Sequence, residues 1–187
     1  IWFRLLRSIR SMTQTDAYTY EYPRPMVTVD AVVLAVSNGR LDVLLIKRKH
    51  EPFKDRWALP GGFIEMEEPL ETAVRRELFE ETGLSRVPLE ELGVFGDPGR
   101  DPRGRTISVA YVAVLDGPAP QPRAGDDAGH AQWFPVANLP ELAFDHREII
   151  TRALAKVAHD AACTEHRPQW YNAETAEIIR NAVARLS

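Results

Sequence analysis

The sequence predicts an α+β domain in which a mixed sheet packs between helices. Two apolar, alternating runs flank Asn38-Gly39, a residue pair that is the strongest short-range signal for a β-hairpin. A helical segment between Pro69 and Gly83 then interrupts the strand-like segments, and helical spacing replaces the strand pattern near the end of the chain. Because strands and helices do not alternate regularly, the order favours a mixed sheet over a parallel βαβ winding.

The first expected elements are a hairpin and a glycine-rich strand end. Strands are predicted at 27–36 and 41–48, joined by the turn 37–40. A short segment at 57–60 runs into Gly61-Gly62, where the backbone can adopt angles and make close contacts that a side chain would prevent. We therefore expect another group to approach this backbone closely.

The remaining elements are predicted from residues that begin or end helices and from hydrophobic periodicity. Pro69 suits the first helical position and Gly83 suits the C-terminal cap, which predicts a helix of about 14 residues. Three more strands are expected at 91–95, 106–115 and 131–134. Two helices are expected after them, at 146–158 and 173–186. We divide the chain into an N-terminal extension, poorly ordered at its start, a central domain and a C-terminal helical extension, at 1–24, 25–158 and 159–187.

Composition excludes several classes of protein. The chain has 187 residues, of which 44% are hydrophobic and 27% charged, a profile typical of a globular domain. Its longest apolar stretch, around 31–36, is far shorter than the run of about 20 residues that crosses a membrane. The net charge of −4 argues against a nucleic-acid partner. One cysteine, Cys163, and no secretory signal favour a cytoplasmic location.

The acidic charge is concentrated in and before the predicted helix. Residues 62–84 hold seven acids and two bases, a net charge of −5, so the rest of the chain carries +1. At about 100° per residue, Leu70, Val74 and Leu78 share one arc, and Glu77 and Glu81 fall within it. A solvated, charged helix would not place two like charges four residues apart on its packing face.

Carboxylates on a packing face must take up protons or bind a cation. A dense set of oxygen ligands without a Cys or His pair nearby suits Mg²⁺, with Mn²⁺ as a substitute, rather than Zn²⁺. Mg²⁺ usually keeps waters and substrate phosphates among its ligands. The helix therefore predicts a magnesium site for a small phosphorylated substrate.

The acidic segment resembles the Nudix box, a motif with fixed glycine, glutamate and arginine positions. The matching residues are Gly62, Glu68, Arg76, Glu77, Leu78, Glu80, Glu81, Gly83 and Leu84. Similarity to Nudix hydrolases implies an α/β/α sandwich and Mg²⁺-dependent hydrolysis of a nucleoside diphosphate linked to another group. It also implies that Glu77, Glu80 and Glu81 act in catalysis as metal ligands together with the Gly61 carbonyl. Gly62, Glu68, Arg76 and Gly83 are expected to support this site structurally.

Segments outside the box are similar to small prokaryotic ADP-ribose pyrophosphatases. The similar segments are 45–49, 57–63, 93–106 and 142–146. This resemblance implies cleavage of ADP-ribose to AMP and ribose 5-phosphate, by an enzyme that forms a homodimer. It also points to an acidic general base in the loop before the late tryptophan strand, for which Asp127 is the candidate.

Arginines are the candidates for substrate contact. A loop rich in proline and glycine carries Arg100, Arg103 and Arg105, whose planar donors suit phosphate or ribose oxygens. We expect Arg100 and Arg103 to touch substrate, with Arg48, at the end of a strand, as a weaker candidate.

Two alternatives stay open on the sequence alone. Another Nudix hydrolase, acting on oxidised nucleoside triphosphates or dinucleoside polyphosphates, would share the same box. A non-catalytic, Nudix-like transcriptional regulator would sense ADP-ribose without cleaving it. Such regulators commonly lose box residues and carry a winged helix, for which the segment after the predicted domain is short.

Overall fold

The computed structural model describes residues 20–117, 119–123, 128–163 and 172–186. The start of the N-terminal extension, with its predicted disorder, lies outside these residues. The elements in chain order are β1 (Met26–Ser37), β2 (Arg40–Arg48), β3 (Trp57–Ala58), β4 (Gly61–Phe63), α1 (Leu70–Thr82), β5 (Glu90–Phe95), β6 (Thr106–Leu115), β7 (Ala128–Pro135), α2 (His146–Ala162) and α3 (Ala173–Ala184). Every predicted element is present, with ends that differ by a few residues.

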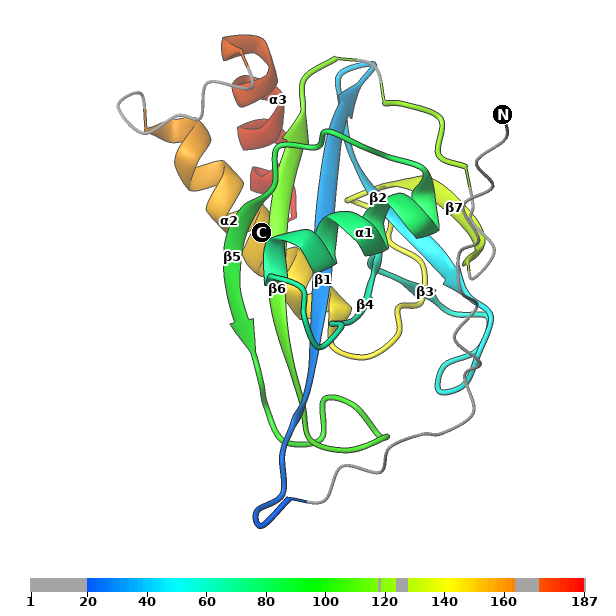
Figure 1. Ribbon diagram of the computed structural model, residues 1–187. Helices are drawn as coiled ribbons and strands as arrows, with labels where there is room; N and C mark the ends of the chain where they lie inside the picture. Colours follow the sequence, from blue (N-terminus) through cyan, green and yellow to red (C-terminus); the bar gives the residue numbers. More distant parts are fainter. Residues whose placement is uncertain (1–19, 118, 124–127, 164–171, 187) are drawn as a thin grey trace, which may run out of the picture.

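The sheet is mixed and is organised around β1 (Figure 1). β6 pairs with β1 in parallel along ten residue pairs, from Met26↔Thr106 to Ala35↔Leu115. The opposite edge of β1 is shared, because β4 pairs antiparallel with its first half and β2 with its last residues. β5 pairs antiparallel with β6, and β3 and β7 pair antiparallel with β2. The shared edge brings the glycine strand β4 beside Thr28, Val29 and Asp30 of β1.

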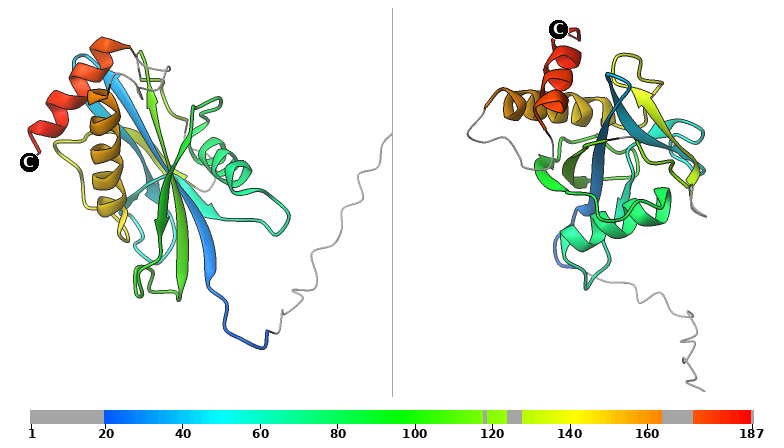
Figure 2. Two further views of the ribbon diagram at one scale, coloured as in Figure 1. Left: turned by 90° about the vertical axis from the view of Figure 1, so that its left-hand side faces the viewer. Right: turned by 90° about the horizontal axis from the view of Figure 1, so that it is seen from above.

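The two main cores lie on opposite faces of the sheet because successive strand side chains point to opposite faces. A third, smaller cluster in the described residues contains Ile46, Ala58 and Ala143. Val32 and Leu34 of β1 join a core with α2 and α3, whereas Val29, Ala31 and Val33 join a core with α1. Figure 2 shows the resulting layers, with α1 on one face of the sheet and α2 and α3 on the other. The predicted sandwich, a mixed sheet between helices, is confirmed.

Local turn chemistry matches the predicted boundaries. Asn38 and Gly39 have φ angles of 52° and 69°, which is the backbone that a tight hairpin requires. Gly83 has φ 72° and donates its N–H to the Phe79 carbonyl, so it ends α1. Pro69 has φ −63° and takes the N-cap position, and the helix starts one residue after it.

The C-terminal helices are part of the same core. The boundary predicted between 158 and 159 falls inside α2, which continues to Ala162. Ala176 and Ile179 of α3 are buried in the core that α2 shares with β1. Within the described ranges, every helix falls short of the length and apolar content that a membrane crossing requires.

Candidate active site

The packing face of α1 carries both apolar and acidic side chains, as its sequence predicts. Val74 and Leu78 are buried against the sheet. Leu70, which the helical wheel places on this face, is 37% exposed because it lies at the very start of the helix, and its predicted burial is wrong. Phe79 on the opposite side is exposed. Glu77 and Glu81 therefore face the protein from a well-packed helix.

Gly61 and Gly62 let these carboxylates lie directly on the backbone of β4. The Gly61 N–H donates to Glu81 Oε2 at 2.9 Å. A Cβ at position 62 would lie 2.5 Å from Glu77 Oε1, and a Cβ at position 61 would lie 2.1 Å from the Val29 carbonyl oxygen. The close approach expected from the glycine pair is therefore that of the α1 carboxylates on one side and of β1 on the other.

Arg76 connects the acidic residues of the motif. Its guanidinium donates to Glu68 at 2.7 and 3.1 Å, to Glu77 at 2.8 Å and to Glu80 at 3.1 Å. It also donates to the Phe63 carbonyl at 3.1 Å, which connects this hydrogen-bond network to the end of β4. Hydrogen bonds from Arg76 lower the pKa of Glu68. One arginine thus orders three carboxylates and one strand end.

Burial gives the two inward carboxyl groups an unmet need for positive charge. It raises the pKa of Glu81 to about 8, with the Gly61 N–H opposing the shift. It also raises the pKa of Glu77, against the effect of Arg76. A hard divalent cation between them would meet this need with the oxygen ligands that Mg²⁺ prefers. The donor set of Glu77, Glu80, Glu81 and the Gly61 carbonyl therefore fits the predicted metal.

The carboxylates of the site are not arranged around a common point as metal ligands would be. Among the described residues, no group of three His, Cys, Asp or Glu side chains has metal-binding geometry. Glu77 and Glu80 are held instead by Arg76. A bound Mg²⁺ would therefore draw further ligands from water and from substrate phosphate, as this ion usually does.

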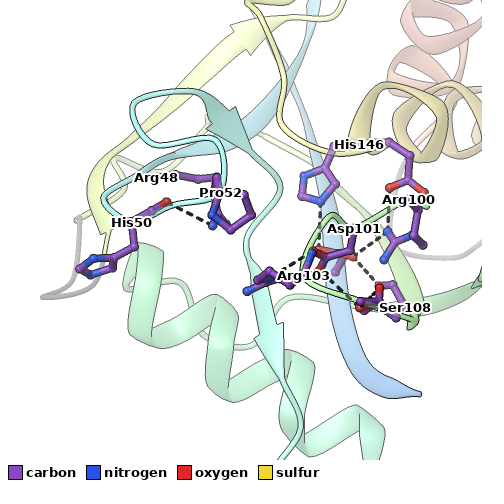
Figure 3. Close-up of polar contacts among 12 residues, drawn as sticks. Arg48, His50, Pro52, Arg100, Asp101, Arg103, Ser108 and His146 are labelled. Carbon is purple, nitrogen blue, oxygen red and sulfur yellow. Dashed lines mark hydrogen bonds and ion pairs between the residues drawn. The ribbon is translucent and has the colours of Figure 1, made fainter. Parts of the chain in front are cut away.

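A cavity of about 180 Å³ opens beside Glu81. It lies between β1, β2, β4, the β5–β6 loop and the segment that leads into α2. Figure 3 shows Arg100, Asp101 and Arg103 of the β5–β6 loop near His146 at the start of α2. Its polar lining includes Asp30, Arg48, Glu81, Arg100, Asp101 and Arg103. Its apolar lining includes Ile46, Leu59, Phe63 and Phe144.

Two of the three candidate arginines are held by carboxylates. Arg100 donates to both oxygens of Asp145 at 2.7 Å, and its side chain is only 5% exposed. Arg103 forms a forked pair with Asp101, at 2.7 Å for the shortest contact, and lies over the Phe63 ring. Both line the cavity, but much of their donor capacity is used within the protein.

Arg48 is held differently. Its guanidinium donates to the backbone carbonyls of Pro52 at 2.8 Å and His50 at 3.4 Å, and lies 4.8 Å from the centre of the Phe144 ring. Burial lowers the pKa of Arg48, and Arg103 adds to this effect. Within the described ranges Arg48 has no ion pair with a carboxylate, so it is the lining arginine best able to receive an anion.

Sequence reasoning missed a buried polar group at the floor of the cavity. Asp30 in β1 is 6% exposed and accepts a hydrogen bond from the Ser108 hydroxyl. His146 Nδ1 accepts the Leu59 N–H at 2.8 Å, which leaves the Nε2 proton directed toward Asp30, at 3.6 Å. The available signal was a charged residue in the middle of an otherwise apolar strand.

The proposed general base, Asp127, lies outside the described residues, so its role stays a prediction. The described segment before it is attached to the end of α1. The Arg123 N–H donates to the Thr82 carbonyl at 2.8 Å, and the Arg123 Cβ lies beside Gly83.

Comparisons with known proteins agree with the motif. The model of the NUDIX domain matches residues 25–153. The chain is 48% identical over 129 residues to the ADP-ribose pyrophosphatase of Methanocaldococcus jannaschii, covering 69% of this chain and 73% of that protein. It is 37% identical to the ADPR responsive transcriptional repressor NtrR of Acinetobacter baylyi, covering 73% of this chain but only 56% of the repressor.

Solved structures place the fold in the same group. The MutT/nudix family protein of Enterococcus faecalis superposes with a TM-score of 0.78 at 32% identity, covering 89% of this chain and 76% of that chain.

The buried imidazole predicts a pH dependence of stability. Burial lowers the pKa of His146, and Arg100 and Arg48 act in the same direction, while Asp30 and Asp145 oppose them. The unfolded chain takes up this proton near about pH 6.5, but the folded chain does not. The stability contributed by neutral His146 is therefore complete above that pH and is lost progressively as the pH falls below it.

Urea unfolding between pH 7.5 and 5.5 checks this expectation. His146→Gln should show a flatter pH dependence of the unfolding free energy than the parent protein. The control His159→Gln, at an exposed position of α2, should keep the parent slope. Equal slopes for the parent and His146→Gln would contradict the prediction.

Proposed function

The chain belongs to the Nudix hydrolase family, and on that premise we propose that it hydrolyses ADP-ribose to AMP and ribose 5-phosphate in a Mg²⁺-dependent reaction. The observation that carries this proposal is the pair of buried carboxyl groups, Glu77 and Glu81, set on the Gly61-Gly62 backbone at the edge of a cavity. In the reaction, water oxygen bonds to one phosphorus and the bridging P–O bond breaks. The proton lost by the water passes to a general base, and the leaving phosphate oxygen takes up the bond electrons.

The metal site is assigned to Glu77, Glu80, Glu81 and the Gly61 carbonyl. When bound there, Mg²⁺ would neutralise the diphosphate and lower the pKa of an attacking water. Arg76 keeps Glu77 and Glu80 close to their places, and Glu68 in turn helps to fix Arg76. The protein thus provides an arranged set of acidic ligands, which limits the reorganisation needed at the time of reaction.

Arginine and aromatic side chains support the choice of a nucleotide substrate. Arg48, without a carboxylate partner in the described part of the chain, can neutralise phosphate, and its place over the Phe144 ring fixes its direction. Arg100 and Arg103 are proposed to touch substrate with the donors that Asp145 and Asp101 leave available. ADP-ribose is favoured over other nucleotides because both curated relatives described above are named for it.

Hydrolysis is favoured over sensing alone because the acidic motif is complete. Glu68, Arg76, Glu77 and Glu80 form one connected web, and Glu81 lies on β4. A protein that only recognised ADP-ribose would not need to keep two carboxylates poorly compensated inside the structure. We also propose a homodimer as the working form.

Measuring products tests the substrate. With Mg²⁺, ADP-ribose should give AMP and ribose 5-phosphate faster than NADH, oxidised dGTP or diadenosine polyphosphates give their products, and Mn²⁺ should support part of the rate. Chelation with EDTA should abolish turnover, since the acidic residues alone cannot neutralise the diphosphate. A higher kcat/KM for oxidised dGTP would overturn the choice of ADP-ribose. DNA binding that depends on ADP-ribose, with no turnover, would favour a regulator.

Replacing one buried carboxylate tests the metal site. Glu81→Gln keeps the size and the contact with Gly61 but removes the charge, so kcat should fall by at least about 100-fold. Glu71→Gln on the same helix is the matched control, because Glu71 is exposed and, among the described residues, its ion-pair partner is Arg75 alone. Steady-state kinetics at saturating Mg²⁺ should show near-parent turnover for the control. Parent-like turnover of Glu81→Gln would refute the assignment.

Substituting Asn for each Asp in the segment before β7 tests the proposed general base. Asp127→Asn should lower kcat by about 100- to 10,000-fold with little change in KM, because a general base acts only during the chemical step. Asp126→Asn, its chain neighbour, should retain most activity. Near-normal turnover of Asp127→Asn would mean that another group accepts the proton.

A further inference from the structure

Building on the function proposed above, we propose that Asp30 recognises the vicinal hydroxyl groups of a substrate ribose from the floor of the cavity. Asp30 lies in the middle of β1, outside the acidic motif, and lines the same cavity as Glu81. Its backbone pairs with Gly61, whose N–H is bonded to Glu81. A sugar held by Asp30 would therefore lie next to a diphosphate held at the metal site.

Asp30 is only a secondary partner of the arginine beside it. Arg100 is the nearest guanidinium, but its fork is taken by Asp145 at 2.7 Å and lies 3.9 Å from Asp30. The ion pair of Arg100 is therefore complete without Asp30. A buried carboxylate is costly unless it is paired or used.

The two oxygens of Asp30 differ in their surroundings. Oδ2 accepts the Ser108 hydroxyl and faces Arg100. Oδ1 has His146 Nε2 at 3.6 Å, beyond hydrogen-bonding distance, and lies on the side of Gly61. An ionised carboxylate has about four acceptor positions, so Asp30 retains capacity for donors that enter the cavity. Ser108, Arg100 and His146 hold the carboxylate in place while leaving that capacity open.

The chemistry of this acceptor selects a class of ligand. A carboxylate accepts hydrogen bonds and repels phosphate, so it suits the part of the substrate that carries hydroxyl groups. A ribose diol offers two neighbouring donors, and carboxylates recognise ribose hydroxyls in dinucleotide-binding proteins. The cavity volume of about 180 Å³ is below that of typical whole-ligand pockets. It is therefore suited to one sugar rather than to a complete nucleotide.

Binding of reaction products tests the proposal without requiring turnover. Calorimetry with Mg²⁺ measures the dissociation constants of two ligand pairs. One pair is ribose 5-phosphate and 2-deoxyribose 5-phosphate, and the other is AMP and 2′-deoxy-AMP. The parent should bind the ribo member of one pair about 10- to 100-fold more tightly, the value of a hydrogen bond to a charged group. The pair that shows this preference identifies which sugar Asp30 contacts.

Asp30→Asn should abolish that preference, with ADP-ribose turnover as a second readout. Asp42→Asn is the matched control, because Asp42 is equally buried in the sheet and is paired with Arg40 outside the cavity. It should keep the parent preference. Thermal unfolding of each variant checks that it is folded.

Two results would overturn the role of Asp30. One is a parent protein that binds both members of each pair equally, a measurement that needs no variant. The other is Asp30→Asn weakening ribo and deoxy ligands by the same factor, as a purely structural role requires. If the parent does not hydrolyse ADP-ribose but still prefers the ribo ligand, only the proposed function is refuted.

Discussion

The close contact between a helix and a strand without side chains is the constraint on which this molecule depends. Glu77 and Glu81 can lie on the backbone of β4 only because Gly61 and Gly62 have no Cβ. That contact fixes the distance between α1 and the sheet, and it buries charge that a packed helix would ordinarily exclude. Val74 and Leu78 supply the apolar burial that holds the helix in this position. Packing thus maintains an electrostatic cost, which the proposed metal ion would relieve.

Charge in and around the cavity is arranged in pairs, with few groups left open. Arg100 is matched by Asp145, Arg103 by Asp101, and Arg76 by three glutamates. Such forked pairs hold both partners rigidly, which suits the proposed role of holding a flexible diphosphate in one position. Among the described residues, the groups left open include Glu81, which has no ion-pair partner, Arg48, which favours an anion, and the acceptor face of Asp30, which favours hydroxyl donors.

Three residues at the entry to α2, Phe144, Asp145 and His146, link these parts of the site. Phe144 has φ 52°, an unusual angle for a bulky residue, and its ring lies against Arg48. Asp145 and His146 follow directly and reach Arg100 and Asp30. Three consecutive residues thus connect the end of β2, the β5–β6 loop and the middle of β1. This segment explains how residues from opposite parts of the chain share one cavity.

Local patterns in the sequence determined the hairpin, the ends of α1, the alternating faces of β1 and the acidic face that faces inward. Each of these depends on residues a few positions apart, whose geometry is set by turn chemistry or by helix and strand periodicity. The relative roles of the arginines depended on distant partners. Local sequence makes Arg48 the weakest candidate, but in the structure Asp145 and Asp101 hold the other two arginines.

The tertiary structure alone decided that Asp30, Arg100, Ser108 and His146 meet. Their contacts require the parallel register of β1 and β6, the division of the β1 edge between β2 and β4, and the position of the segment before α2. A charged residue in an apolar strand is visible in the sequence, but its partners are 70 or more positions away. No local periodicity carries that information, because it arises only when the strands pair and the helices close over them.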